Sequence, residues 1–422
     1  MLMILGIQST AEAWEIKSTN SGTPIRWADG AVAIDLDFSA ELYGIHSADA
    51  EREARAAFAS WGTMLGSHLA ISFETGDAGL GTGRDGLNVV RWGTDADDEF
   101  VDPVALGTTY LTYKTSTGQI LEADIVINGV NYEWTMVEGE CSDRYDLQNI
   151  LAHETGHLLG IAHSVDHNES TMYPSAGMCE TKKRALATDD QEAITFLYDS
   201  IVLEAPGSLT DEILGCQTAG GTGLWGAIAL LLVFAGLRRG LRKRHWGIAS
   251  ASAVLLVAGL GSAEASTLLQ LEPSELVDRA DVIVQGTVVR QEVVLRNDQP
   301  TTISTIAVAG CANAPCPATI AVHQLGGEVG GIGLIVSGVH HLAVGGEVLL
   351  FLRSTKVGLR PVGRAQGIFQ VSRVDGSEVL TRDLRGSVLT RSGKSREGAR
   401  ESMSRVQFDR IYAPKILKSK AP

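Results

Sequence analysis

Residues 153–163 read H-E-T-G-H-L-L-G-I-A-H, and the spacing of their histidines and glycine is the most informative pattern in the first half of the chain. His153 and His157 are four residues apart, so on an α-helix their imidazoles stand one turn apart and can reach one ion. Gly160 can take the left-handed conformation that ends a helix, which would bring His163 back toward the same ion. Three neutral histidines leave a fourth position open, so the sequence predicts a catalytic metal site rather than a structural one.

The residues around the motif support a helix with a catalytic carboxylate. Glu154 lies next to the first ligand, where it can hydrogen-bond a metal-bound water without being a ligand itself. Asp146 is a plausible helix cap, and the helix has an apolar face at Leu147, Ile150, Leu151 and Leu158. A core helix that merely contains histidines is the weaker interpretation, because it would bury three imidazoles without polar compensation.

Residues 14–200 resemble a matrixin catalytic domain of the metzincin zinc peptidases. Met172 follows His163 by nine residues in S-T-M-Y-P, as the methionine turn of metzincins does. The resemblance rests on His153, Glu154, His157, Gly160, His163-Ser164, Met172-Tyr173-Pro174, Arg184-x-Leu186, Asp189-Asp190, Ala193-Ile194 and Leu197-Tyr198.

This resemblance implies an α/β (α+β) domain with a mixed sheet and an active-site helix. It makes His153, His157 and His163 the ligands of one catalytic zinc, Glu154 the general base and Met172 the apolar floor beneath the metal. Gly160 and Pro174 become structural residues of the site. By the same resemblance, the segment 105–113 is an exposed edge strand that pairs with an extended substrate.

The sequence also departs from the family pattern. Tyr173 directly follows the methionine, one residue before the position of the tyrosine ligand of other metzincins. We therefore do not expect Tyr173 to be a zinc ligand. The spacing from His163 to Met172 is one residue longer than expected, which predicts a loop insertion. No P-R-C-G-x-P-D segment precedes the motif, so we expect no cysteine-switch latency.

Hydrophobic periodicity predicts further elements in this half. Strands are expected at 31–38, 88–92, 105–113 and 120–128, and Ser47 is expected to cap a helix whose buried face is Ala54, Phe58, Trp61 and Leu65. An acidic loop could hold Ca²⁺, although a solvated loop is the favoured interpretation; it contains Asp95, Asp97, Asp98, Glu99 and Asp102.

Charge separates the two halves of this 422-residue chain. Residues 1–215 contain 35 acidic and 11 basic side chains, a net charge of −24, whereas residues 216–422 contain 15 acidic and 24 basic ones, a net charge of +9. Phosphate binding needs clustered Lys and Arg, so the first half is not expected to bind nucleic acid. The length predicts two or more domains.

Five cysteines and a leader-like start indicate an exported protein. Residues 1–13 end in Ala-Glu-Ala, which has the form of a signal-peptidase site. Cys141 and Cys179 flank the predicted active-site segment, and Cys311 and Cys316 enclose a tight loop, so two disulfides are plausible, with Cys216 left over.

The middle of the chain predicts membrane segments. Residues 219–237 carry no charge and are followed by five basic residues between 238 and 244, which predicts a transmembrane helix with a cytoplasmic basic flank. A second uncharged stretch, 246–263, ends in another Ala-Glu-Ala. It is either a second transmembrane helix or the signal segment of a second, fused protein. The region from Cys216 through the arginines also resembles a myxobacterial-type C-terminal sorting tail.

The predicted order is therefore a signal peptide (1–13), a zinc metallopeptidase domain (14–215), a transmembrane helix with its basic flank (216–245), a second helix or signal-like segment (246–265) and a β-rich domain of unknown function (266–422). Short strands predict a small barrel or sandwich in the last part; they are expected at 281–290, 302–309, 318–323, 333–336, 347–352 and 367–371. A short helix is expected at 272–280, and the basic tail from 382 onward is expected to be loose.

Two functions follow from these observations. The matrixin resemblance implies a zinc endopeptidase that acts on protein or peptide substrates outside the cell and is anchored in the membrane or at the cell surface. The alternative is a cell-surface binding or adhesion protein that uses the β-rich domain and keeps an inactive metzincin scaffold. Inactive relatives usually lose a ligand or the glutamate, and here all four residues are present, which favours the enzyme.

Overall fold

A computed structural model describes residues 14–75, 80–96, 98–137, 141–164, 166–200, 267–312, 317–384, 388–391 and 394–419. The segments 14–200 and 267–419 belong to one compact unit. The predicted signal peptide, both predicted membrane segments, the sorting tail and Cys216 lie outside the described residues. No helix within the described ranges is long and apolar enough to cross a membrane, and the predicted domain boundaries stay predictions.

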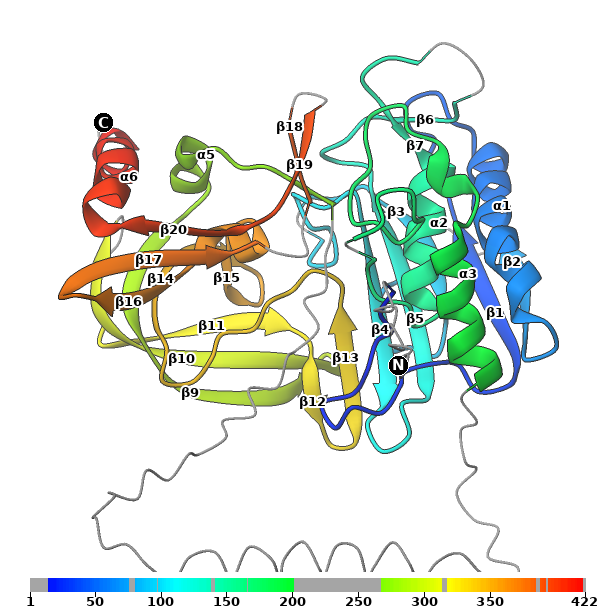
Figure 1. Cartoon of the computed structure of the whole chain (residues 1–422), viewed down its shortest axis with the longest axis horizontal. Helices are drawn as coiled ribbons and strands as arrows, with labels where there is room; N and C mark the ends of the chain where they lie inside the picture. Colours follow the sequence, from blue (N-terminus) through cyan, green and yellow to red (C-terminus); the bar gives the residue numbers. More distant parts are fainter. Residues whose placement is uncertain are drawn as a thin grey trace, which may run out of the picture. The chain divides into compact units, whose positions relative to one another are not determined.

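A mixed sheet forms the frame of the first half (Figure 1). Its strands are β1 (Gly30–Asp37), β2 (Leu69–Thr75), β3 (Val89–Gly93), β4 (Gly107–Lys114) and β5 (Ile120–Asn128). Strands β2, β1, β3 and β5 are parallel neighbours, and β4 runs antiparallel to β5. The periodicity predicted four of these strands, and β2 was missed although L-A-I-S-F-E alternates apolar and polar residues in part.

Two helices share one hydrophobic core with this sheet. They are α1 (Ser47–Leu65) and α2 (Leu147–Leu158), and Trp61 Nε1 on α1 donates to the carbonyl of Ala152 on α2 at 2.8 Å. The predicted apolar face of α1 is buried. The predicted cap at Ser47 was wrong, because His46 occupies the N-cap position and its side chain makes no capping hydrogen bond.

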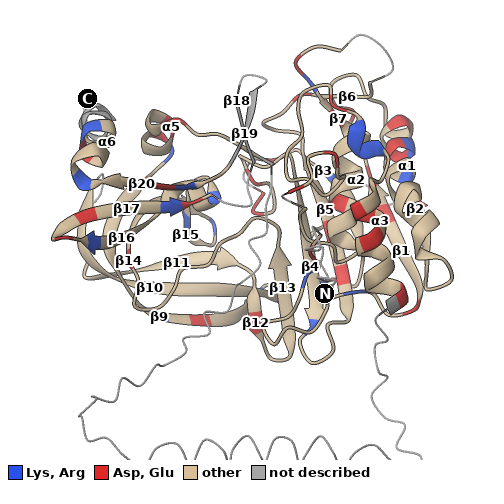
Figure 2. Cartoon of the chain, in the orientation of Figure 1, with Lys and Arg blue, Asp and Glu red and all other residues tan. Residues whose placement is uncertain are grey.

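Shorter elements complete this half. They are β6 (Trp134–Thr135), β7 (Tyr145–Asp146), a 3₁₀ turn (Lys182–Arg184), α3 (Thr188–Thr195) and a π turn (Phe196–Ser200). Figure 2 shows acidic side chains on α1 and α3 and basic ones on β16, β17 and α6, but α1 also carries basic residues and β9, β12 and β17 carry acidic ones. The two halves therefore differ in the proportion of each charge rather than in its presence.

The second half contains a closed barrel, one of the two architectures predicted for it. Its strands are β9 (Val282–Arg296), β10 (Gln299–Ala312), β11 (Thr319–Leu325), β14 (Glu347–Thr355) and β15 (Gly358–Pro361). The order β14-β9-β10-β11 is a Greek key. Strand β15 closes the ring because it pairs with both β11 and β14. Five-stranded Greek-key barrels of this kind include the OB-fold.

The remaining elements of the second half surround the barrel or extend from it. They are β8 (Thr267–Leu269), α5 (Pro273–Asp278), β12 (Gly327–Val329), β13 (Ile332–Val336), a 3₁₀ turn (Arg364–Gly367), β16 (Ile368–Val374), β17 (Ser377–Asp383), β18 (Val388–Arg391), β19 (Lys394–Glu397), β20 (Arg400–Ser404) and α6 (Arg405–Ser419). The prediction of a loose tail was wrong, because Phe408 and Tyr412 of α6 stack with ring centroids 4.4 Å apart and are buried.

Strand β4 is not an exposed edge, and this part of the prediction was wrong. Strand β13, which comes from the second half of the chain, pairs antiparallel with β4 and is itself extended by β12. The first sheet therefore has the order β12-β13-β4-β5-β3-β1-β2 (Figure 1). Every residue of β4 except Lys114 is buried.

Candidate metal centre and catalytic site

Helix α2 begins and ends at the residues that the sequence indicated. The Asp146 side chain accepts a hydrogen bond of 2.9 Å from the amide of Asn149, which caps the helix. Arg184 also contacts the Asp146 carboxylate, at 2.8 Å through Nε. At the other end, Gly160 has φ +98°, and a Cβ there would lie 2.2 Å from the carbonyl oxygen of Ile25. Only glycine fits this turn, after which the chain leads to His163.

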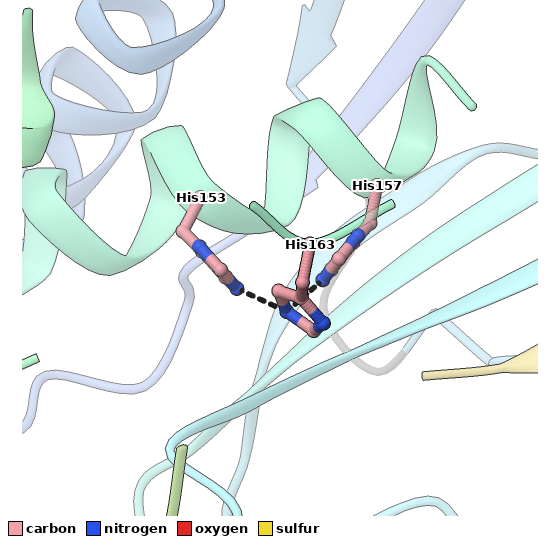
Figure 3. A group of neighbouring side chains, drawn as sticks. All are labelled: His153, His157 and His163. Atoms are coloured by element: carbon pink, nitrogen blue, oxygen red, sulfur yellow. Dashed lines mark hydrogen bonds between the residues drawn. The ribbon is translucent and has the colours of Figure 1, made fainter. Parts of the chain in front are cut away.

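The three histidines converge on one point (Figure 3). His153 Nε2 and His157 Nε2 lie 2.9 and 2.8 Å from His163 Nε2. The first two rings are fixed by backbone oxygens: His153 Nδ1 donates to Thr171 at 2.7 Å, and His157 Nδ1 donates to Ile161 at 2.9 Å. With their protons on Nδ1, both rings direct an Nε2 lone pair toward His163.

This donor set fits a bound cation. Burial lowers the pKa of His153 to about 3 and holds the pKa values of His157 and His163 well below the usual value, so the rings are neutral. One proton on His163 Nε2 satisfies only one of the two facing lone pairs, whereas a metal ion accepts all three nitrogens. Three imidazoles with an open fourth position are typical of catalytic zinc.

Glu154 lies beside the histidines and against strand β4. Thr109 Oγ1 donates to Glu154 Oε2 at 2.6 Å. A Cβ on Gly107 would lie 2.9 Å from Glu154 Oε1, so the absence of a side chain at this position makes room for the carboxylate. Burial raises the pKa of Glu154 to about 7, against the opposing effect of the Thr109 hydrogen bond. The sequence indicated Glu154 but gave no signal for Thr109 or Gly107.

The buried carboxylate of Asp190 stabilises the methionine turn. Asp190 accepts hydrogen bonds from the amides of Thr171 and Met172 at 2.7 and 3.0 Å. The Met172 side chain is buried beneath helix α2, where a Cβ on Gly156 would lie 2.2 Å from its sulfur. Pro174 is buried as well. Asp189-Asp190 belongs to the family pattern in the sequence, and the structure shows that Asp190 binds the amides of the methionine turn.

Lys183 is a second buried group behind the site, and sequence reasoning missed it. Its Nζ donates to the carbonyl oxygen of Thr171 at 3.0 Å and also contacts the carbonyl oxygen of Tyr173. Burial lowers the pKa of Lys183 to about 7. The carbonyl oxygen of Thr171 therefore accepts hydrogen bonds from both Lys183 and His153. Lys183 is linked in this way to the orientation of the His153 ring.

The acidic loop uses three of its carboxylates to bind arginines. Asp98 pairs with Arg91 at 2.6 Å, within the first half of the chain. Two others pair with the second half: Glu99 lies 2.9 Å from Arg360, and Asp102 lies 2.6 Å from Arg364. These partners satisfy the charges without a metal ion, so Ca²⁺ binding by the loop stays a prediction without structural support.

One predicted disulfide is present in full. Cys141 and Cys179 are bonded, 38 residues apart in the sequence, and they connect the segment before α2 to the segment after the methionine turn. Cys311 is also disulfide-bonded. Cys316 lies outside the described residues, so its pairing with Cys311 stays a prediction.

The mixed sheet, the helix with its H-E-x-x-H histidines and the third histidine after a glycine turn are features that residues 26–199 share with the metzincin class. Residues 26–199 match the family model of the matrixins, and this part of the chain is a matrixin domain.

Named relatives agree with this assignment. Metalloendoproteinase 2-MMP of Arabidopsis thaliana is 35% identical over 147 residues, which are 34% of this chain and 35% of the relative. Metalloendoproteinase 1-MMP of the same plant is 26% identical over 193 residues, 42% of this chain and 45% of the relative. Matrix metalloproteinase-18 of Xenopus laevis is 40% identical over 65 residues, 15% of this chain and 13% of the relative. The chain thus spans less than half the length of these relatives.

Proposed function

We propose that the first half of the chain is a zinc-dependent endopeptidase. The observation that supports this most is the convergence of the Nε2 atoms of His153, His157 and His163 beside the carboxylate of Glu154. The three histidines would hold one zinc ion, and Glu154 would be the general base. Zinc, when bound, supplies a Lewis acid that polarises the substrate carbonyl and lowers the pKa of water.

Glu154 would move the proton during hydrolysis. Its carboxylate takes a proton from the attacking water and passes it to the nitrogen of the leaving amine. Thr109 keeps the carboxylate against β4 and away from other rotamers.

The substrate would be an extended polypeptide. Strand β4 passes directly beside Glu154 through Gly107 and Thr109, and a substrate chain that took the edge of β4 now paired with β13 would pass in front of the proposed catalytic carboxylate. Main-chain hydrogen bonds to β4 would supply affinity for many sequences. This supports protein or peptide substrates as a class and leaves the preferred side chains open.

We also propose that the chain is exported and that its substrates are extracellular proteins. Bonded cysteines at Cys141, Cys179 and Cys311 support an oxidising compartment. Anchoring in the membrane by 219–237 stays part of this proposal, and it rests on the sequence alone. The alternative, a binding protein with an inactive scaffold, is not favoured because the ligands and Glu154 converge.

The test replaces Glu154. Glu154→Gln should retain zinc and lose at least about 10²-fold in kcat, because the amide cannot accept the proton. The comparison is made in the full chain and in the full chain with Gly333→Val, because a side chain at Gly333 of β13 would meet Tyr113 of β4 and is expected to separate the two strands. Glu133→Gln is the matched control, since that carboxylate is exposed and pairs only weakly with Arg144 at 3.4 Å. Equal turnover by Glu154→Gln and its parent would rule out Glu154 as the general base.

A further inference from the structure

The candidate site is closed in this structure. Residues His153, Glu154, His157 and His163 are 5%, 5%, 1% and 3% exposed. An endopeptidase has to admit a polypeptide several residues long, so something that covers the site must move. The cover over strand β4 comes from the second half of the chain.

Strand β13 occupies most of the edge of β4 that a substrate would use. Its register runs from Ile332 opposite Lys114 to Val336 opposite Tyr110. The next residue, Ser337, donates its amide to the carbonyl of Thr109 at 3.3 Å. The added strand therefore ends at the residue whose hydroxyl holds Glu154.

The other end of this edge is covered by two further segments. Leu269 of β8 donates its amide to the carbonyl of Val104 at 2.6 Å. Arg364 lies between β8 and β13, where its Nη2 donates to Thr108 Oγ1 at 2.9 Å and its Nε pairs with Asp102 at 2.6 Å. The same guanidinium also contacts the carbonyl of Ser337. Residues of the second half therefore contact this edge at Val104, Thr108 and Thr109 and along 110–114.

Side chains fix the cover on both faces of the sheet. Ile335 packs against the core that α2 shares with the sheet. On the opposite face, residues of both halves form one cluster, with Tyr110 and Val126 from the first and Leu334 and Val336 from the second.

Polar contacts add to this packing. Glu328 of β12 accepts hydrogen bonds from Tyr113 Oη at 2.9 Å and from the amide of Asn20 at 2.8 Å. Lys17 Nζ reaches Ser337 Oγ at 3.4 Å. The hairpin is therefore bound at β12 and just beyond the end of β13 as well as along β4, rather than at a single point.

We propose that the hairpin 327–337, together with Arg364, is a built-in inhibitor that holds the peptidase latent by occupying the substrate edge of β4. The proposal rests on the endopeptidase function above. Strand β13 and a substrate strand need the same N–H and C=O groups of β4, so they exclude one another. Because the inhibitor is tethered, its effective concentration is high, and a cut within 201–266 would lower that concentration without breaking the contacts themselves.

A matched pair of glycine substitutions in the full chain tests this. A Cβ on Gly333 of β13 would lie 2.1 Å from the ring of Tyr113 on β4, so Gly333→Val should force the two strands apart. Gly310 of β10 has open space around it, and Gly310→Val should leave the pairing intact. Ile335→Asp is a second way to open the pair, because it places a carboxylate against the apolar core only while β13 is docked.

Two readouts separate this proposal from the proposed function. Amide hydrogen exchange of 110–114 and 332–336 reports whether the strands are paired, and cleavage of an unfolded protein reports activity. Gly333→Val and Ile335→Asp should exchange faster and cleave at least about tenfold faster than the parent and Gly310→Val. Faster exchange with cleavage unchanged from an active parent would overturn the inhibitor. Faster exchange with no cleavage by any zinc-loaded variant would overturn the endopeptidase and leave the strand contact standing.

Discussion

Thr109 and Glu154 are 45 residues apart in the sequence, and the hydroxyl of Thr109 donates a 2.6 Å hydrogen bond to Glu154 Oε2. One residue belongs to the sheet and the other to the helix packed on it. The contact fixes the carboxylate at the junction of the two elements. Thr109 is thus a positioning residue for the proposed general base.

We expect Thr109→Val to lower kcat by about tenfold or more, since a hydrogen bond to a charged group contributes about 1.5–3 kcal/mol. The Michaelis constant should change little, because the Thr109 side chain is turned toward Glu154. Thr109→Ser should restore kcat, since it keeps the hydroxyl. Steady-state kinetics in the Gly333→Val background measures both. A valine variant with normal kcat would show that the contact is only structural.

Gly160→Ala should reduce both stability and zinc content. The new Cβ would meet the carbonyl of Ile25, and φ +98° is strained for alanine, so we expect a loss of more than about 1 kcal/mol. Gly62→Ala in α1 is the control, because nothing lies within 4 Å there and the helix should gain about 0.5–1 kcal/mol. Urea unfolding and metal analysis give the two values, and a Gly160→Ala protein that matches its parent in both contradicts the assigned turn.

The lowered pKa of Lys183 predicts that the stability of the fold depends on pH. Its pKa is lowered to about 7 by burial, whereas in the unfolded chain it stays near 10.5. Between these values the unfolded state binds more protons, so this residue makes the free energy of unfolding rise with pH from about 7 to 10.5. Lys183→Met should remove that rise, and the neighbouring Lys182→Met, 31% exposed, should keep it. Parallel curves for all three proteins would refute the shift.

The disulfide between Cys141 and Cys179 should stabilise the fold through the unfolded state. It closes a loop that contains every proposed zinc ligand, with a sequence separation of 38. Replacing both cysteines by serine should lower the free energy of unfolding by about 3–4 kcal/mol. Denaturant unfolding at neutral pH checks this, and Ser142→Ala is a neighbouring control. No loss in the double variant would mean that the loop is already ordered without the bond.

Local patterns in the sequence determined much of the first half. The spacing of His153, His157, Gly160 and His163 predicted a helix followed by a turn, and the histidines meet as that geometry requires. Asp146 caps this helix. These features are local, because they follow from the helical period and from the conformational freedom of glycine, and a short stretch of sequence contains both.

Tertiary structure alone decided what lies against these elements. The pairing of β13 with β4, the contact of Thr109 with Glu154 and the closure of the barrel by β15 join residues far apart in the chain. A strand's alternation shows which residues are buried, but the edge it pairs with depends on register and on complementary packing between distant segments. The sequence therefore indicated the proposed zinc ligands and general base, and only the folded chain showed that its own second half covers them.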